Sequence, residues 1–221
     1  IFLIKVDSDD RFILNEIYVH NIYDPKQCKI YPNYTIVDIG AHKGIFSLYA
    51  SKKAQNGRIL SFEPSQENFK FLKNHVILNK CSNVKIFNTA VTNKKGSRIF
   101  YEANKEHSGR NSFYKFAKEG KKVEVETTNL LTIIKENNLE KIDFLKLDCE
   151  GAEYEILFNA SEKLLSKIHK ISMEYHDMDS KRNGIRLQKF LEDHSFRTFS
   201  PKSSTLLFAE NLQTDKPWGI T

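Results

Sequence analysis

The chain of 221 residues has few cysteines, no long apolar run and little arginine. Its three cysteines, Cys28, Cys81 and Cys149, are widely spaced and form no CxxC pair, so neither a disulfide framework nor a zinc knuckle is expected. No apolar run approaches the roughly 18–20 residues that a membrane helix needs, and the first residues show no secretory leader. We therefore expect a cytoplasmic protein without a membrane partner. The sequence begins at Ile1 rather than at methionine, which leaves open whether a segment precedes it.

The formal net charge is +6, and lysine heavily outnumbers arginine among the basic residues. Arginine is the residue best suited to bidentate contacts with phosphate and guanine. The lysine surplus is spread over separate pairs, such as Lys52-Lys53 and Lys121-Lys122, and forms no single patch. A nucleic-acid partner is therefore disfavoured, but it stays open as an alternative.

Hydrophobic residues make up 40% of the chain and charged residues 28%, which fits one globular domain with a full core. From residue 34 onward, short apolar runs alternate with segments of helical periodicity. This alternation predicts an α/β fold with a mainly parallel sheet and right-handed crossovers. The predicted strands are residues 34–39, 58–62, 84–88, 142–147 and 168–175, with a closing pair at 196–199 and 204–209. The predicted helices are residues 45–53, 66–79, 129–137, 152–165 and 185–194.

Residues 1–33 precede this pattern. Apolar segments at 2–6 and 12–19 flank an acidic turn, so we predict an N-terminal β-hairpin, followed by a connector that holds Pro25 and Pro32. The main domain is expected over residues 34–210, with an inserted strand pair and loop near 97–127, and a tail over 211–221. The polar stretch 103–120 has little to bury, and we expect it to be a surface lid that helps to select the substrate, with a passive surface loop as the equally open alternative.

Two of the predicted strands end in residues suited to a cofactor. Residues 37–44 read VDIGAHKG, in which Gly40 and Gly44 permit a tight turn and close approach of a ligand to the backbone. The spacing is GxxxG rather than the GxGxxG of dinucleotide-binding proteins, and glycines also end strands for structural reasons. Glu63, followed by Pro64, lies 19 residues after Gly44, close to the spacing of an acidic residue that binds ribose hydroxyls. Asp38, the glycine turn and Glu63 together predict a cofactor site.

The predicted strands 142–147 and 168–175 deliver acidic residues and a histidine. Asp148 directly follows strand 142–147, so we expect it in the cleft. For Glu153 we favour a role at the start of the following helix, whereas for Glu150 that role and a functional one stay equally open. Glu174 and His176 end the following strand. His176 is a candidate general base, or a metal ligand with Asp148 and Glu174, although a lone histidine is often only a loop residue. We assign catalytic roles to Asp148, His176 and Glu174, and no metal site.

These segments carry a family resemblance. VDIGAHKG, FEPS, NTAV, LKLDCEGAEYEIL and ISMEYH occur in an order and spacing that resemble the FkbM family of methyltransferases, over roughly residues 10–210. The resemblance implies a Rossmann-like sheet of seven strands with its last strand antiparallel. It also implies S-adenosyl-L-methionine as methyl donor and a hydroxyl acceptor on a small molecule or sugar.

The resemblance also implies roles for individual residues. The methionyl end of the cofactor would lie near Asp38, Gly40, His42 and Gly44. The ribose would lie near Glu63, the adenine near Asn88 and Ala90, and the methyl group would face Asp148. The chain departs from the family at Ser65, where asparagine is common, and at Lys43, an unusual neighbour for a sulfonium cation.

Three other functions stay open. An RNA methyltransferase would share the cofactor site but would need a basic face with aromatic residues. A nicotinamide-dependent oxidoreductase would share the sheet, but the missing GxGxxG disfavours it. A non-catalytic nucleotide-binding module would fit if the carboxylates were only helix caps. The acceptor, the need for a metal and the oligomeric state are not decided by the sequence.

Overall fold

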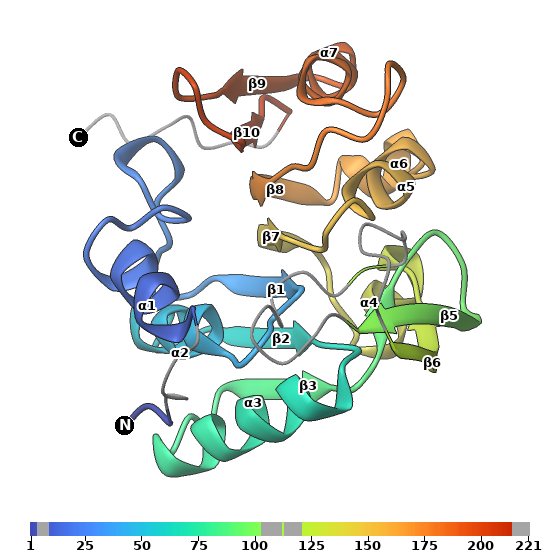
Figure 1. Cartoon of the computed structure of the whole chain (residues 1–221). Coiled ribbons are helices and arrows are strands. Elements are labelled where there is room, and N and C mark those ends of the chain that lie inside the picture. Colours follow the sequence, from blue (N-terminus) through green and yellow to red (C-terminus); the bar gives the residue numbers. More distant parts are fainter. Residues whose placement is uncertain (4–8, 103–111, 113–120, 214–221) are drawn as a thin grey trace.

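The structure, a computed structural model, describes residues 1–3, 9–102, 112 and 121–213. Its centre is a sheet of seven strands in the order β3-β2-β1-β7-β8-β10-β9 (Figure 1). These strands are β1 (Thr35–Ile39), β2 (Arg58–Phe62), β3 (Val84–Phe87), β7 (Ile142–Leu147), β8 (Ile168–Glu174), β9 (Phe196–Phe199) and β10 (Leu206–Asn211). Neighbouring strands are parallel except at β10, which runs antiparallel to both β8 and β9. The predicted mainly parallel sheet with an antiparallel last strand is confirmed.

The central strands β1, β7 and β8 are almost entirely buried and mostly apolar because both faces of the sheet are covered. Side chains alternate between the faces, so Ile36 and Phe144 join one hydrophobic core while Val37 and Leu145 join the other. The first core includes side chains of helices α1 (Asp10–Tyr18) and α2 (Ile45–Lys53). The second includes side chains of α4 (Leu130–Glu136), α5 (Glu153–Phe158), α6 (Glu162–Leu165) and α7 (Gly184–Asp193). Helix α3 (Gln66–Leu78) lies beside β3 (Figure 1).

A second, smaller sheet holds the inserted strands. Strands β5 (Gly96–Glu102) and β6 (Lys121–Thr128) are antiparallel, as predicted, and β4 (Ala90–Val91) pairs in parallel with β6. Strand β4 has only two residues, and no pattern in the sequence predicts it. Of the predicted lid, only Ser112 belongs to the described residues. It exchanges backbone hydrogen bonds with Tyr101 at 2.8 and 3.0 Å.

The predicted N-terminal β-hairpin is wrong in its second arm, and residues 4–6 of its first arm lie outside the described residues. Its second arm is helix α1, in which Ile13, Leu14, Ile17 and Tyr18 fall on one face and pack against the core around α2. The apolar run fitted a strand and a helix equally well, and burial against α2 favours the helix. The connector after α1 includes a short 3-10 helix, η1 (Lys26–Cys28).

The helix predicted over residues 152–165 is two helices. Helix α5 ends at Phe158, and α6 starts anew after Ser161, whose side chain accepts a hydrogen bond from the Leu164 backbone at 3.3 Å. A serine that caps a second helix start is the local reason for the break. None of the helices in the described parts of the chain is long and apolar enough to cross a membrane.

Candidate active site

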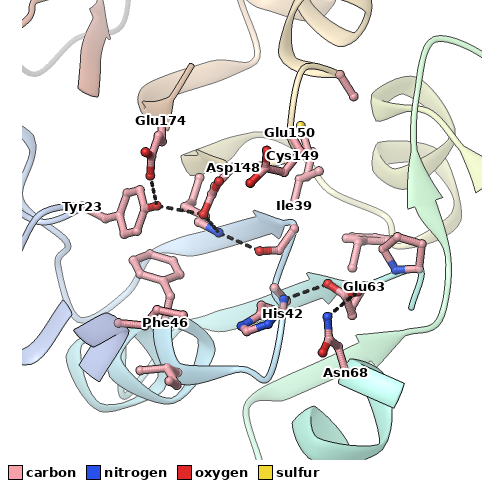
Figure 2. A pocket seen from close by; sticks show the side chains of 18 of the residues that line it. Tyr23, Ile39, His42, Phe46, Glu63, Asn68, Asp148, Cys149, Glu150 and Glu174 are labelled. Carbon is pink, nitrogen blue, oxygen red and sulfur yellow. Dashed lines mark hydrogen bonds and ion pairs between the residues drawn. The ribbon is translucent and has the colours of Figure 1, made fainter. Parts of the chain in front are cut away.

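A cavity of about 440 Å³ opens at the carboxyl ends of β1, β2, β7 and β8 (Figure 2). The strand order reverses between β1 and β7, and open parallel sheets bind ligands at such a point. Helix α1 contributes a wall that includes Phe12, Ile13 and Glu16. The predicted site residues that line the cavity are Gly40, His42, Glu63, Pro64, Ala90, Asp148, Glu174 and His176.

Glycines allow the turn after β1 to pack closely. Gly40 has a φ of +76°, and a Cβ there would lie 1.8 Å from the carbonyl oxygen of Asp148. Gly44 caps α2 with a φ of +84°, and its Cβ would lie 2.4 Å from Cδ1 of Leu72. Neither position accepts a side chain without a shift. Gly40 lines the cavity, whereas Gly44 serves helix packing and lies outside the lining.

Asp38 lies beneath the cavity rather than in its wall. Its Oδ2 accepts a hydrogen bond from Ser47 Oγ at 2.7 Å, and its Oδ1 is 3.4 Å from Lys146 Nζ. Burial raises the pKa of Asp38, while Lys146 and Ser47 counteract that rise. Lys146 also donates to the carbonyl of Gly40 at 2.8 Å. Asp38 therefore supports the glycine turn from below through Lys146.

Glu63 is held by backbone donors at the end of β2. Its Oε2 accepts from the N–H of His42 at 2.8 Å (Figure 2). Its Oε1 accepts from the N–H of Ser65 at 2.9 Å. Burial raises the pKa of Glu63 to about 7, against the lowering effect of these N–H groups. Burial, together with the charge of Lys43, lowers the pKa of His42 to about 4, so this ring is neutral near pH 7. A fixed carboxylate thus faces the cavity beside a neutral imidazole.

The end of the cavity beyond Glu63 is apolar. Phe62, Ala90 and Phe100 contribute to its lining, from β2, β4 and β5. Asn88 does not line the cavity. Its side chain donates to the carbonyls of Glu63 at 2.9 Å and Pro64 at 3.0 Å, which fixes the turn after β2.

At the opposite end, Asp148 and Glu174 share a buried tyrosine. The Tyr23 hydroxyl donates to Asp148 Oδ2 at 2.9 Å and lies 3.4 Å from Glu174 Oε2 (Figure 2). Lys146 Nζ is 3.6 Å from Asp148 Oδ2. Burial and the charge of Asp148 raise the pKa of Glu174. Glu16 of α1 faces the same pair, and burial and the charges of Glu174 and Asp148 raise its pKa too.

His176 lies between two other carboxylates. Its Nε2 is 3.5 Å from Glu150 Oε2, and its Nδ1 is 3.4 Å from Glu153 Oε1. Although burial disfavours the charged ring, the carboxylates of Glu153, Glu150 and Asp148 raise the pKa of His176 to about 10. Burial raises the pKa of Glu150 to about 7. Both ring nitrogens therefore face acidic groups of this cluster.

Comparison with known proteins identifies the family. A model of the methyltransferase FkbM domain matches residues 38–199. The chain belongs to the FkbM family of methyltransferases. It is 30% identical over 217 residues to methyltransferase sdnD of Sordaria araneosa, covering 84% of this chain and 82% of that protein.

A second relative of this FkbM-family chain is the 31-O-demethyl-FK506 methyltransferase FkbM of Streptomyces tacrolimicus. The two are 23% identical over 200 residues, covering 78% of this chain and 76% of that protein. Sp1610 of Streptococcus pneumoniae, solved in complex with S-adenosyl-L-methionine, superposes with a TM-score of 0.50 at 10% identity. This match covers 85% of this chain and 71% of the other, and it shows the fold alone.

As a member of the FkbM family, the protein uses S-adenosyl-L-methionine as its methyl donor, and the cavity suits that molecule. An apolar end is suited to a base, and Glu63 offers carboxylate oxygens where a ribose diol needs acceptors. Gly40 lines the cavity, and its lack of a side chain lets the turn after β1 pack against the backbone of Asp148. The donor groups present therefore fit the cofactor.

Sequence reasoning missed several members of this FkbM-family site. Tyr23 comes from the connector after α1, where no pattern singles it out. Lys146 carried a signal, because a charged residue within a fully buried strand requires partners. Lys43, noted as an unusual neighbour for a sulfonium, does not line the cavity; it forms a buried ion pair with Asp10 of α1.

Proposed function

We propose that the protein transfers a methyl group to a hydroxyl oxygen of a small molecule or sugar. The observation that carries this proposal is the Asp148 carboxylate, which lines the cavity and is held by the Tyr23 hydroxyl. A neutral hydroxyl is a weak nucleophile, and a carboxylate within hydrogen-bond reach can orient it and accept its proton. The name of the Streptomyces relative, a 31-O-demethyl-FK506 methyltransferase, describes an O-methylation and supports the same reaction type here.

The cofactor would lie along the cavity from the apolar end toward Asp148. Phe62, Ala90 and Phe100 would enclose the adenine, Glu63 would accept hydrogen bonds from the ribose hydroxyls, and the turn at Gly40 would lie beside the methionyl end. When bound, S-adenosyl-L-methionine supplies a methyl group that its sulfonium activates for displacement. The protein then has to place the acceptor in line and remove its proton.

Asp148 is the better candidate for accepting the proton. Its Oδ2 is oriented by Tyr23, and its side chain is 30% exposed toward the cavity. His176 has both ring nitrogens turned toward Glu150 and Glu153, so neither nitrogen is directed at an acceptor. Glu174 is 3.4 Å from the same tyrosine hydroxyl and would help to hold it in place.

A small acceptor suits the walls better than RNA does. Asp9, Glu16, Glu150 and Glu174 all contribute to the lining, in addition to Asp148. Carboxylates repel a phosphate backbone, whereas RNA-binding surfaces are basic. The apolar side chains of Phe12 and Ile13 beside them would contact the carbon skeleton of the acceptor.

The test is the variant Asp148→Asn, which keeps the shape and removes the charge. Parent and variant would be given S-adenosyl-L-methionine with a labelled methyl group and a panel of hydroxylated sugars and small molecules. We expect the variant to bind S-adenosylhomocysteine within a few-fold of the parent. Its turnover on the acceptor found should fall by at least about 100-fold, the low end of base catalysis. Asp193→Asn, an exposed aspartate of α7 outside the cavity, is the matched control. Retained turnover in Asp148→Asn would refute the role of Asp148.

A further inference from the structure

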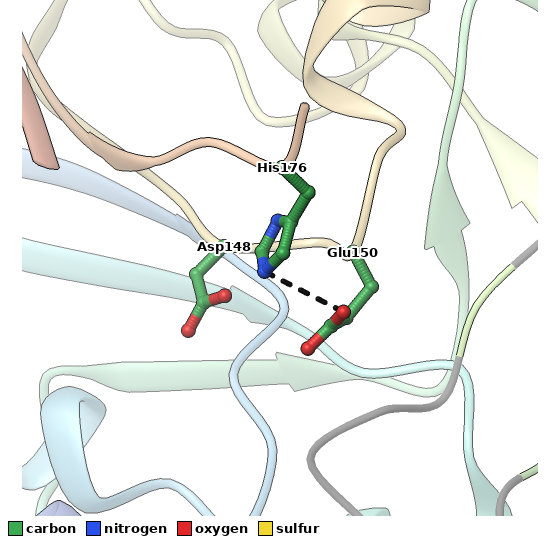
Figure 3. A group of neighbouring side chains, drawn as sticks. All are labelled: Asp148, Glu150 and His176. Carbon is green, nitrogen blue, oxygen red and sulfur yellow. Dashed lines mark ion pairs between the residues drawn. The ribbon is translucent and has the colours of Figure 1, made fainter. Parts of the chain in front are cut away.

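Three side chains with metal-ligating atoms lie close together at the end of the cavity that contains Asp148. One ligand atom each from Asp148, Glu150 and His176 lies within 4.8 Å of the other two (Figure 3). We propose that these three residues form a binding site for a divalent cation. The inference goes beyond the proposed O-methylation, because it assigns a second cofactor and because cation binding can be measured without an acceptor.

The spacing of the ligands suits an ion after small side-chain rotations. Two ligands on opposite sides of a cation, each about 2.1 Å from it, are about 4.2 Å apart. His176 Nε2 and Glu150 Oε2 are 3.5 Å apart, which exceeds a direct hydrogen bond of roughly 2.7–3.2 Å but leaves them close enough to share an ion. Two carboxylates and an imidazole form a mixed oxygen and nitrogen donor set, which suits a transition-metal dication such as Mn²⁺.

The backbone of two ligands is fixed by side chains from elsewhere in the fold. Ser112 donates through Oγ to the carbonyl of Glu150 at 2.7 Å, and Glu150 itself adopts a φ of +53°. Tyr154 donates through its hydroxyl to the carbonyl of His176 at 3.0 Å. These contacts hold the turn after β7 and the segment after β8. The side chains of Glu150 and His176 point toward each other from these two segments, as Figure 3 shows.

The position of Glu153 beside His176 independently supports a cation bound to this histidine. Its side chain is fully buried, and its Oε1 lies 3.4 Å from His176 Nδ1 while accepting from the N–H of Cys149 at 3.0 Å. Its Oε2 has no hydrogen-bond partner within the described residues. Metal-binding histidines commonly have a carboxylate behind the ring nitrogen that does not bind the metal. Glu153 occupies that position and directs Nε2 toward Glu150 and the cavity.

A cation in this place would act on the acceptor. A hydroxyl coordinated to a dication is much more acidic than a free one, so its proton can leave at neutral pH. Asp148 would then serve both as a ligand and as the group that keeps the hydroxyl in line. The reaction stays a methyl transfer to oxygen, with the proton released to the carboxylate cluster.

The experiment measures Mn²⁺ binding to the chelator-treated chain of 221 residues by electron paramagnetic resonance, with calorimetry as a second readout. We expect one bound ion per chain. Glu150→Gln and His176→Gln should each weaken binding by at least about tenfold, in the range expected for altered metal sites. Glu153→Gln should weaken Mn²⁺ binding as well, since it removes the negative charge beside Nδ1 of His176. Circular dichroism and S-adenosylhomocysteine binding would show that each variant is folded.

Glu174→Gln is the matched control, because it removes a carboxylate from the same cavity but not from the ligand set. Its Mn²⁺ affinity should stay within about threefold of the parent. Equal weakening by Glu174→Gln and Glu150→Gln would mean that cations only accumulate near the acidic wall, and would overturn the site. Absence of binding at about 1 mM Mn²⁺ would also overturn it and leave His176 as an imidazolium paired with two carboxylates. In either case, methyl transfer in the presence of chelator would leave the proposed O-methylation intact.

Discussion

Glu63 and Asp148 both follow strands of the sheet, but their surroundings differ. Glu63 is 4% exposed and accepts hydrogen bonds from two backbone N–H groups, whereas the Asp148 side chain is 30% exposed and accepts one from a tyrosine. The first arrangement fixes a carboxylate for binding. The second leaves a carboxylate oxygen, Oδ1, that can reach a substrate.

The raised pKa of Glu63 predicts that cofactor binding depends on pH. The ionised carboxylate is the better acceptor for ribose hydroxyls, and with a pKa of about 7 it is ionised only above that pH. The dissociation constant of S-adenosylhomocysteine should therefore fall as pH rises toward 7, by up to about tenfold per pH unit, and level off above it. Calorimetry between pH 5.5 and 8.5 would measure this.

Glu63→Ala is the control for that titration. The variant should bind about 1.5–3 kcal/mol more weakly at pH 8 and should lose the dependence on pH. His42 stays neutral over this range, because its pKa is lowered to about 4. A variant that keeps both the affinity and the pH dependence would show that Glu63 does not contact the ribose.

Tyr23→Phe tests how far Asp148 depends on its hydrogen-bond donor. We expect turnover to fall by about tenfold or more, because the Asp148 carboxylate loses the donor that orients it. Affinity for S-adenosylhomocysteine should stay within about threefold, because the variant leaves Glu63 and the turn at Gly40 unchanged. Single-turnover kinetics would measure the methyl-transfer step. Tyr49→Phe is the matched control, since Tyr49 donates to Asp24 at 2.7 Å in the same core but outside the cavity. Equal losses in the two variants would indicate a general effect on the core.

Site residues were predictable where strand position alone determines them. Glu63 and Asp148 follow buried strands, and the carboxyl ends of parallel strands form the ligand-binding edge. Asp38 was assigned to the cofactor site from its place before the glycine turn and from the family resemblance. It lies within β1, does not line the cavity and pairs with Lys146. Tyr23 reaches the site only through tertiary packing, which no local pattern encodes.

At the scale of elements, the buried parallel strands were predicted well because each is a short apolar run between turns. Helix α1 was not, because a short apolar segment fits both periodicities and only its packing against α2 distinguishes them. That packing matters for function, since α1 forms a wall of the cavity. The ion pair between Asp10 of α1 and Lys43 connects this wall to the turn between β1 and α2.

Lys43→Met tests that connection. Both side chains of the pair are almost fully buried, so the variant leaves the Asp10 carboxylate in the core without its lysine. Removing one partner of a buried pair costs about 3–5 kcal/mol, and we expect a loss of that order in the free energy of unfolding. Urea denaturation would measure it. The double variant Asp10→Leu with Lys43→Met should recover at least half of the loss, because no buried charge remains. A single variant as stable as the parent would show that the pair does not hold α1.

At the scale of the whole molecule, the cavity is lined by residues from both hydrophobic cores, which lie on opposite faces of the sheet. Its lining draws Ile17, Phe46 and Tyr23 from the core on one face of the sheet, and Phe62, Ala90 and Phe100 from the core on the other. The two meet where Gly40 touches Asp148 between β1 and β7. A ligand that fills the cavity therefore contacts both halves and stabilises them together.

Binding in this cavity predicts a thermal shift with the product cofactor, because a ligand that binds only the folded state stabilises it. At a free concentration about 100 times its dissociation constant, S-adenosylhomocysteine should stabilise the fold by about 2.7 kcal/mol. For a chain of this size, that corresponds to a rise in Tm of about 5–10 °C. NAD at the same concentration should raise Tm by less than about 1 °C, because the turn after β1 has the spacing GxxxG and lacks the glycines that admit a pyrophosphate. Differential scanning calorimetry with both ligands would decide the matter. An equal shift with NAD would mean that the cavity recognises only the adenosine that the two molecules share, and that its Asp148 end contributes nothing to binding.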